Sequence, residues 1–184
     1  MTTVGTVFAN VQNKHSAPGI CTHSGQALLH LYRATGDAAY LDLLYAIAGA
    51  IPQFVSREDR PIRSQDGRAM PSGWINERVN TSDWDNNLGG IFYGSTWCEI
   101  ALLLTYAELP GLYVDLETQR YWTMEPIDVQ FTDQGVRITN RSAFKARIKV
   151  LMEGALERRQ PLELDGFCGK RIELDAGQTS TLPC

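Results

Sequence analysis

The stretch from Gly73 to Glu99, GWINERVNTSDWDNNLGGIFYGSTWCE, brings carboxylates together with aromatic rings. Its candidate catalytic residues are Glu77, Asp83 and Asp85. Two carboxyl groups that flank a glycosidic bond can serve as a general acid and as a base or nucleophile, and their separation sets the stereochemical outcome. The structural alternative is that Asp83 caps a turn or helix while Glu77 pairs with an arginine on a loop. The residue types therefore indicate chemistry on a sugar without fixing the reaction.

Aromatic residues in the same stretch could bind the apolar face of a sugar ring. Three of the chain's four tryptophans lie in it. Trp74, Trp84 and Tyr93 could stack on sugar rings, and the two tryptophans lie in sequence rich in Asn, Gly and Ser that is typical of a loop. Core filling is the alternative for each, and it is favoured for Trp97, which lies on a predicted buried helix.

Two further polar residues are candidates for substrate binding. Arg78 could hold a carboxylate, such as that of a uronic acid, through its planar fork of donors, although a salt bridge across the loop is the favoured alternative. His23 precedes the first predicted helix and could orient a ligand. Because His15 and His23 lack the close spacing typical of a metal site, we expect no metal, and we expect no cofactor.

Two helices joined by a tight turn precede this stretch and position it. From Ser24 to Ala34 apolar residues follow helical spacing, and Gly36 lies just past the end. A second amphipathic helix follows Asp37, with Pro52 bending or ending it near Val55. The pattern predicts an αα-hairpin.

Beyond the aromatic stretch the hydrophobic period changes. A third helix is predicted from about Ser95 to Glu108, apolar nearly all round and therefore buried. After about Leu112 the period becomes two, with turn residues at Asp133-Gln134-Gly135. The clearest strand alternates apolar residues from Phe144 to Met152 with cationic ones. An all-β part is therefore expected after the helices.

Composition and charge exclude several kinds of partner. The 184 residues are 43% hydrophobic, with a formal net charge of -4. Such a chain has no electrostatic footprint for nucleic acid, and no run approaches the roughly 20 apolar residues of a membrane span. The N-terminus does not resemble a signal peptide, and the four separated cysteines favour reduced thiols. We therefore expect a cytoplasmic location, with export possible if the natural product is longer.

The glycosylation pattern occurs twice in the sequence. The triplets that begin at Asn80 and Asn140 fit it. Without a secretion signal, these triplets carry little weight.

The hairpin sequence SGQALLHLYRATGDAAYLDLLYAIAGAIPQFVSR resembles the repeating unit of the six-hairpin, (α/α)6-toroid glycosidase-like proteins, in which a helix ends in an A-TGD-Y turn that leads into the next helix. The segments GWINERVNTSDWDNN and FYGSTWCEIALLLTYAELPGLYV resemble the last hairpin of a bacterial group in that superfamily, and the following strands resemble its C-terminal β-sandwich. The resemblance implies an α+β fold, with αα-hairpins of an incomplete toroid in residues 1–111 and a small antiparallel β-sandwich in residues 112–184.

The chain is shorter than the toroid that it resembles. About twelve helices with their connections need roughly 250 residues, whereas the predicted helical part ends near residue 110. We therefore expect the C-terminal piece of a longer protein, whose active site is incomplete on this chain alone. A truncated toroid exposes apolar helix faces, which predicts a homo-oligomer formed through them.

Two classes of function follow from these patterns. The first is a carbohydrate-active protein, the C-terminal portion of a glycoside hydrolase-like enzyme that acts on a sugar or uronic-acid-containing substrate, with Gly73–Glu99 as one wall of its site. The alternative is a non-catalytic module that binds saccharide or serves as scaffold and oligomer interface. The sequence leaves open whether this chain is an enzyme.

Overall fold

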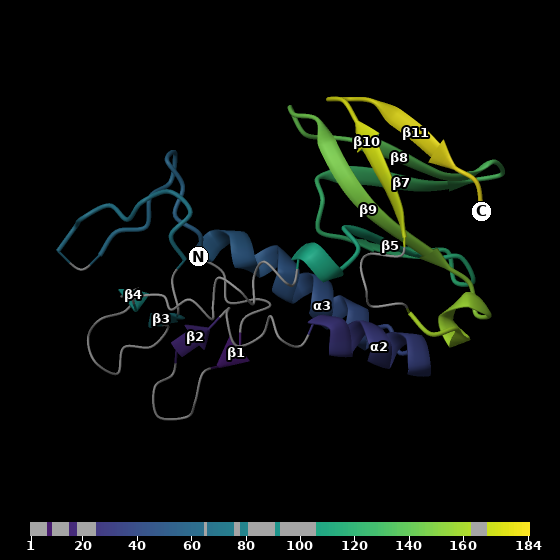
Figure 1. The fold of residues 1–184 in the computed structure, drawn as a ribbon, viewed down its shortest axis with the longest axis horizontal. Helices are drawn as coiled ribbons and strands as arrows, with labels where there is room; N and C mark the ends of the chain where they lie inside the picture. Colours follow the sequence, from purple (N-terminus) through teal and green to yellow (C-terminus); the bar gives the residue numbers. More distant parts are fainter. Residues whose placement is uncertain are drawn as a thin grey trace. The chain divides into compact units, whose positions relative to one another are not determined.

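The computed structural model describes residues 7–8, 15–17, 25–64, 66–75, 78–80, 91–92, 106–162 and 169–184 (Figure 1). The chain divides into two compact units, and each is assembled from two separate stretches. Unit 1 is Met1–Leu29 with Asp42–Thr105, and unit 2 is His30–Leu41 with Tyr106–Cys184. The turn of the predicted helical hairpin therefore belongs to the β-rich unit.

The αα-hairpin predicted from the sequence is confirmed. Helix α2 spans Gly25–Thr35 and helix α3 spans Ala39–Ala50, followed by the 3-10 turn η1 at Ile51–Phe54. Gly36 ends α2 with a positive φ of 75°, and its N–H donates to the carbonyl of Tyr32 at 2.7 Å. The side chain of Asp37 caps α3 by accepting from the N–H of Ala39 at 3.0 Å. No described helix has the length and apolar character needed to span a bilayer.

Short strands occur within the part of the chain that was expected to be helical. Strands β1 (Val7–Phe8), β2 (His15–Ala17), β3 (Arg78–Asn80) and β4 (Ile91–Phe92) pair in that order, each antiparallel to the next. Of the predicted third helix, the described residues 106–108 are helical, and the rest lies outside the described residues. The region expected to consist of αα-hairpins, residues 1–111, therefore also contains strands.

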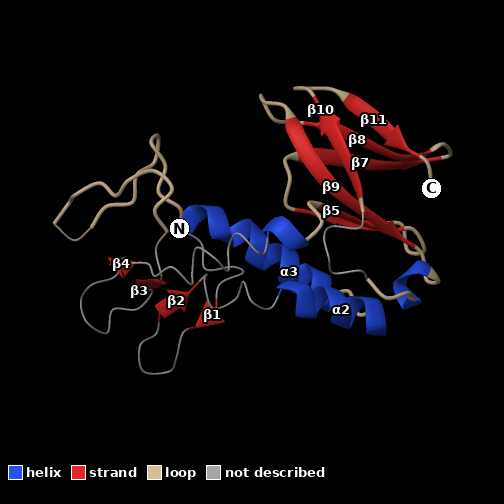
Figure 2. Ribbon diagram, in the orientation of Figure 1, coloured by secondary structure: helices blue, strands red, loops and turns tan. Residues whose placement is uncertain are grey.

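Unit 2 contains two sheets that share one core. A four-stranded sheet has the order β10-β9-β5-β6, and a three-stranded sheet has the order β11-β8-β7 (Figure 2). The elements are β5 (Leu112–Asp115), β6 (Arg120–Thr123), β7 (Ile127–Thr132), β8 (Gly135–Asn140), β9 (Ala146–Glu153), the 3-10 turn η2 (Glu157–Arg159), β10 (Lys170–Leu174) and β11 (Thr179–Leu182).

The sheet topology corrects the predicted fold class. Strands β5 and β9 run parallel, with Leu112 opposite Val150 and Asp115 opposite Glu153, so the four-stranded sheet is mixed and not antiparallel. One helical hairpin, α2 with α3, lies in the described part of the chain, where no toroid of hairpins is found. Local periodicity reports that a strand exists, but the direction in which distant strands pair depends on the path of the chain between them.

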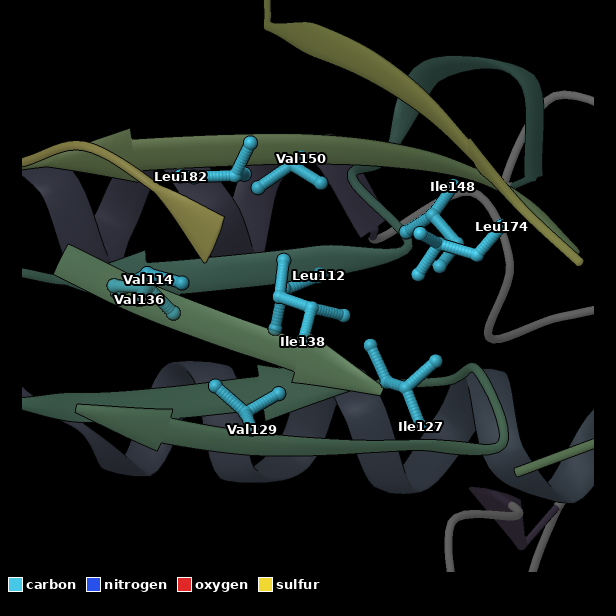
Figure 3. Close-up of a cluster of buried hydrophobic side chains, with 10 residues drawn as sticks. All are labelled: Leu112, Val114, Ile127, Val129, Val136, Ile138, Ile148, Val150, Leu174 and Leu182. Carbon is cyan, nitrogen blue, oxygen red and sulfur yellow. The ribbon is translucent and has the colours of Figure 1, made fainter. Parts of the chain in front are cut away.

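The core of unit 2 lies between the two sheets. Alternate residues of β5 and β9 face alternate residues of β7 and β8, as the period of two requires. Figure 3 shows the ten buried side chains: Leu112, Val114, Ile127, Val129, Val136, Ile138, Ile148, Val150, Leu174 and Leu182. Burying each one stabilises the fold by roughly 1.5–3 kcal/mol relative to exposure. Gly135 is required beside this core, because a Cβ there would collide with the carbonyl of Leu182.

The other face of the four-stranded sheet, here called the outer face, carries polar and aromatic residues. Strand register places these residues on one face, and their burial divides that face into two halves. The buried half consists of Tyr113, Asp115, Trp122, Leu151 and Glu153. The exposed half, on β9 and β10, consists of the exposed residues Arg147, Arg171 and Glu173 together with the half-buried Lys149.

Candidate functional site

The structure describes part of the predicted saccharide site. The residues Glu77, Asp83, Asp85, Trp84, Tyr93 and His23 lie outside the described residues. Arg78 begins strand β3, opposite Phe92 of β4, and so lies in a strand and not in the loop that its sequence suggested. Trp74 lies in the described loop that precedes this strand. The structure therefore leaves the proposed pairing of carboxylates as a prediction.

Trp74 is held on an ordered turn. Its carbonyl accepts from the N–H of Ser56 at 2.7 Å, and its N–H donates to the carbonyl of Pro71 at 3.1 Å. The N–H of Gly73 returns a bond of 2.8 Å to the carbonyl of Ser56, at a positive φ of 87° that favours glycine. The next residue, Ile75, forms a β-bridge with Val55. The backbone is thus fixed while the Trp74 residue stays half-buried.

A group of buried polar side chains lies in unit 2, where helix α2 meets the buried half of the outer face. Arg33 forms a bidentate pair with Glu153, with Nε 3.0 Å from Oε2 and Nη2 2.9 Å from Oε1. Nη2 also donates to the carbonyls of Glu157 and Gln160. Tyr113 donates its hydroxyl to Glu153 Oε2 at 2.9 Å. This buried carboxylate is therefore held by an arginine and a tyrosine.

A second carboxylate, Asp115, is held in the same way. The hydroxyl of Tyr32 donates to Asp115 Oδ2 at 2.5 Å, and Arg158 Nη1 lies 2.8 Å from the same oxygen. Oδ1 accepts from the N–H groups of Glu117 and Thr118 at 2.9 Å and 3.3 Å. Asp115 is 1% exposed. Both of its oxygens are therefore occupied.

The pKa values follow from this arrangement. Burial alone raises the pKa of Asp115, but the hydrogen bonds from Tyr32, Thr118 and backbone N–H groups outweigh burial and hold the pKa below its ordinary value. Burial, followed by the hydrogen bond to Asp115, raises the pKa of Tyr32. Burial and the charge of Glu153 raise the pKa of Tyr113. Near neutral pH, Asp115 therefore stays ionised and both tyrosines stay protonated.

Aromatic rings pack around the two carboxylates. The ring centroids of Tyr32 and Tyr113 lie 5.5 Å apart in an edge-to-face arrangement, and those of Tyr32 and Trp122 also lie 5.5 Å apart. Arg158 lies over the ring of Tyr32 at 5.5 Å, and Arg120 lies over Trp122 at 4.8 Å. This set of aromatic and ionic contacts fastens the end of α2 to the sheet.

The contacts within this group stabilise the fold and leave no carboxylate free for acid–base catalysis. Both carboxylates are committed to arginine and tyrosine donors, whereas a general acid or base must exchange a proton near the working pH. The described residues contain no group of three His, Cys, Asp or Glu side chains that could hold a metal ion. Sequence reasoning missed Arg33, Asp115 and Glu153. A strand that alternates apolar and polar residues has the same sequence pattern whether its polar face contacts water or a helix.

The structure shows whether Asn140, in one of the two glycosylation triplets, is accessible. Asn140 is 0% exposed. Its Nδ2 donates to the carbonyls of Phe144, Leu174 and Asp175 at 2.7 Å, 3.1 Å and 3.1 Å, and its Oδ1 accepts from Ser142. The amide nitrogen that would carry a glycan is therefore buried and bonded in the folded chain.

Comparisons with known proteins add no assignment to this geometry. No protein family matches the chain, and neither the curated proteins nor the solved structures give a match. The resemblance to the six-hairpin proteins therefore stays a prediction, and the toroid that it implied is not found in the described residues.

Proposed function

We propose that this chain is a carbohydrate-binding protein in which the two sheets of unit 2 form a non-catalytic scaffold. The sugar contact is assigned to the stretch Gly73–Glu99. The observation that supports this assignment most is the ordered turn that keeps Trp74 half-buried beside carboxylates and amides in sequence. An indole on a fixed backbone loses little conformational freedom when it stacks on a sugar ring.

The non-catalytic role of unit 2 is supported by its two grouped carboxylates. Asp115 and Glu153 are 1% and 4% exposed, and both accept hydrogen bonds from arginine and tyrosine. A buried, fully bonded carboxylate can neither reach a glycosidic oxygen nor exchange protons with it. The polar group of unit 2 therefore serves to hold the hairpin turn in place.

The test is oligosaccharide binding by the full chain. Calorimetric titration with a panel of neutral oligosaccharides of glucose, xylose and mannose should reveal at least one ligand. Trp74→Ala should weaken its binding roughly tenfold, while Trp74→Phe should retain most of the affinity because a ring remains for stacking. The matched control is Tyr121→Ala, which removes another partly exposed aromatic residue from strand β6 and should leave the affinity unchanged.

Three results would contradict the proposal. If no oligosaccharide binds, or if Trp74→Ala and Tyr121→Ala behave alike, the sugar contact does not lie in the assigned stretch. Release of nitrophenol from chromogenic glycosides by the full chain would contradict the non-catalytic role. Catalysis of that kind would then be sought at Glu77, Asp83 and Asp85.

A further inference from the structure

The exposed half of the outer face surrounds a hollow with excess positive charge. The hollow has a volume of about 280 Å³. Among the described residues that line it, three side chains are cationic and one is a carboxylate. The lining residues are Arg147, Ile148, Lys149, Arg171, Ile172 and Glu173. This volume lies just below the roughly 300 Å³ at which ligand pockets begin, so the hollow suits a small group such as a single carboxylate.

Strand register places two of the cations side by side. Arg171 of β10 lies directly opposite Lys149 of β9 in the antiparallel pair. Like charges in this position destabilise a sheet. The pKa of Lys149 is lowered, first by burial and then by the charge of Arg171, against the opposing charges of Glu125 and Glu108. The pair therefore costs stability in the chain without a ligand.

The cations of the hollow differ in what compensates them. Lys149 Nζ donates to the carbonyls of Tyr106 and Ala107, which lie in the short helical stretch 106–108. Arg147 Nε lies 3.1 Å from Glu173 Oε1, and this carboxylate also pairs with Lys145 at 3.1 Å. Within the described part of the chain, the side chain of Arg171 makes no hydrogen bond or ion pair. The exposed guanidinium of Arg171, directly opposite Lys149, is therefore the feature that remains to be explained.

We propose that this hollow is a subsite for the carboxylate of an acidic saccharide, with Arg171 as its principal contact. The planar guanidinium donates to both oxygens of a carboxylate at once, and Lys149 adds positive potential beside it. Bound carboxylate also relieves the repulsion between Lys149 and Arg171. This inference rests on the proposed carbohydrate function and assigns to unit 2 a saccharide contact of its own.

A structural role for Arg171 would be protection of the sheet edge. Strand β10 is an edge strand, and charged side chains on edges discourage pairing with other chains. Lys170 offers a matched control for that role, because it is an exposed cation on the same strand. It pairs with Val150, so its side chain points to the opposite face of the sheet from Arg171. Either Arg171 or Lys170 could protect the edge of the sheet, whereas only Arg171 could bind a ligand in the hollow.

The experiment is an NMR titration of the full chain with sodium glucuronate, with glucose and with sodium sulfate at matched ionic strength. Glucuronate should shift amide signals of β9 and β10, and Arg171→Gln should weaken this binding at least about tenfold because the paired donors are lost. Lys170→Gln should change the affinity less than about twofold. Circular dichroism of both variants confirms that each is folded before titration.

Each outcome has a defined meaning. Equal weakening by Arg171→Gln and Lys170→Gln, or sulfate binding as tightly as glucuronate, overturns the subsite. If glucuronate binding fails while a neutral oligosaccharide still binds in a Trp74-dependent way, this inference fails and the proposed function stands. If neither kind of sugar binds, the proposed function fails as well. Arg171-dependent binding of glucuronate, with no response to glucose or sulfate at the hollow, supports the subsite.

Discussion

The two halves of the outer face show how burial changes the contribution of an ion pair to the stability of the fold. In the buried half, Asp115 and Glu153 are 1% and 4% exposed and meet Arg158 and Arg33. In the exposed half, the side chains of Arg147 and Glu173 are 80% and 52% exposed. Strand β9 contributes to both halves, so the sequence distance between them is a few residues. What separates them is the hairpin turn, which covers one half through Tyr32 and Arg33.

The two halves of the outer face differ in what their ion pairs can do: one set stabilises the fold, and the other is available to a ligand. Removing one member of a buried ion pair leaves an uncompensated charge in a low dielectric and costs about 3–5 kcal/mol. An exposed pair is solvated and screened, and contributes about 0–1 kcal/mol. The buried half can therefore hold the fold together, while the exposed half can release its charges to a ligand.

The largest expected effect comes from Glu153→Ala. This change leaves the guanidinium of Arg33 buried without its carboxylate and removes the acceptor of Tyr113, so the free energy of unfolding should fall by about 3–5 kcal/mol. Urea denaturation followed by circular dichroism measures it. The comparison variant is Glu173→Ala, whose free energy of unfolding should fall far less because its ion pairs are exposed to solvent. Equal losses in the two variants would remove the distinction between the halves.

An intermediate effect, dependent on pH, is expected for Asp115→Asn. The pKa of Asp115 is lower in the folded chain than its ordinary value of 3.8, so the unfolded chain binds the proton more readily. Its stabilisation is therefore present above that ordinary value and is lost as the pH falls through the folded pKa. Near neutral pH the variant should be less stable than the wild type by about 2 kcal/mol. This difference in stability should become smaller below about pH 4.

Thermal unfolding across this pH range, with wild type and Asp115→Asn side by side, provides the measurement. Lys145→Gln serves as the control, because its partner Glu173 belongs to the exposed half. A gap that stayed constant from neutral to acidic pH would show that the carboxylate charge of Asp115 does not stabilise the fold.

The smallest effect has the opposite sign. Arg171→Gln removes the charge that lies directly opposite Lys149, so the ligand-free chain should gain roughly 0.2–1 kcal/mol at low salt. The gain should shrink as added salt screens the repulsion. Chemical denaturation at low and high salt measures it, with Lys170→Gln as the variant expected to change little. A loss of stability in Arg171→Gln would mean that this side chain has a structural partner.

Some of this architecture could be predicted from the sequence. The hairpin of α2 and α3 follows from helical periodicity, from Gly36 after the first helix and from Asp37 before the second. The strands β7, β8 and β9 follow from alternation and from the turn at Asp133–Gly135. These signals are local, because capping, turns and amphipathic faces depend on neighbours within a few residues.

The rest could not be predicted, because it depends on partners far away in the sequence. The parallel pairing of β5 with β9 joins Asp115 to Glu153, and the ion pair of Arg33 with Glu153 spans 120 residues. Tyr32 looked like one more apolar position of a helix, but its hydroxyl is bonded to Asp115. Glu153 and Lys149 lie on the same side of one alternating pattern, yet one is buried and the other borders a hollow.

The sequence by itself determined the local elements: a capped helical hairpin, alternating strands and an aromatic and acidic stretch whose residue types suit a sugar. Only the tertiary structure decided how the strands pair, which carboxylates are buried and which cations remain exposed. The physical reason is that hydrogen bonds within a helix or turn form between near neighbours. The energy with which two charges interact depends instead on the dielectric around them, and that dielectric depends on which distant part of the chain buries them.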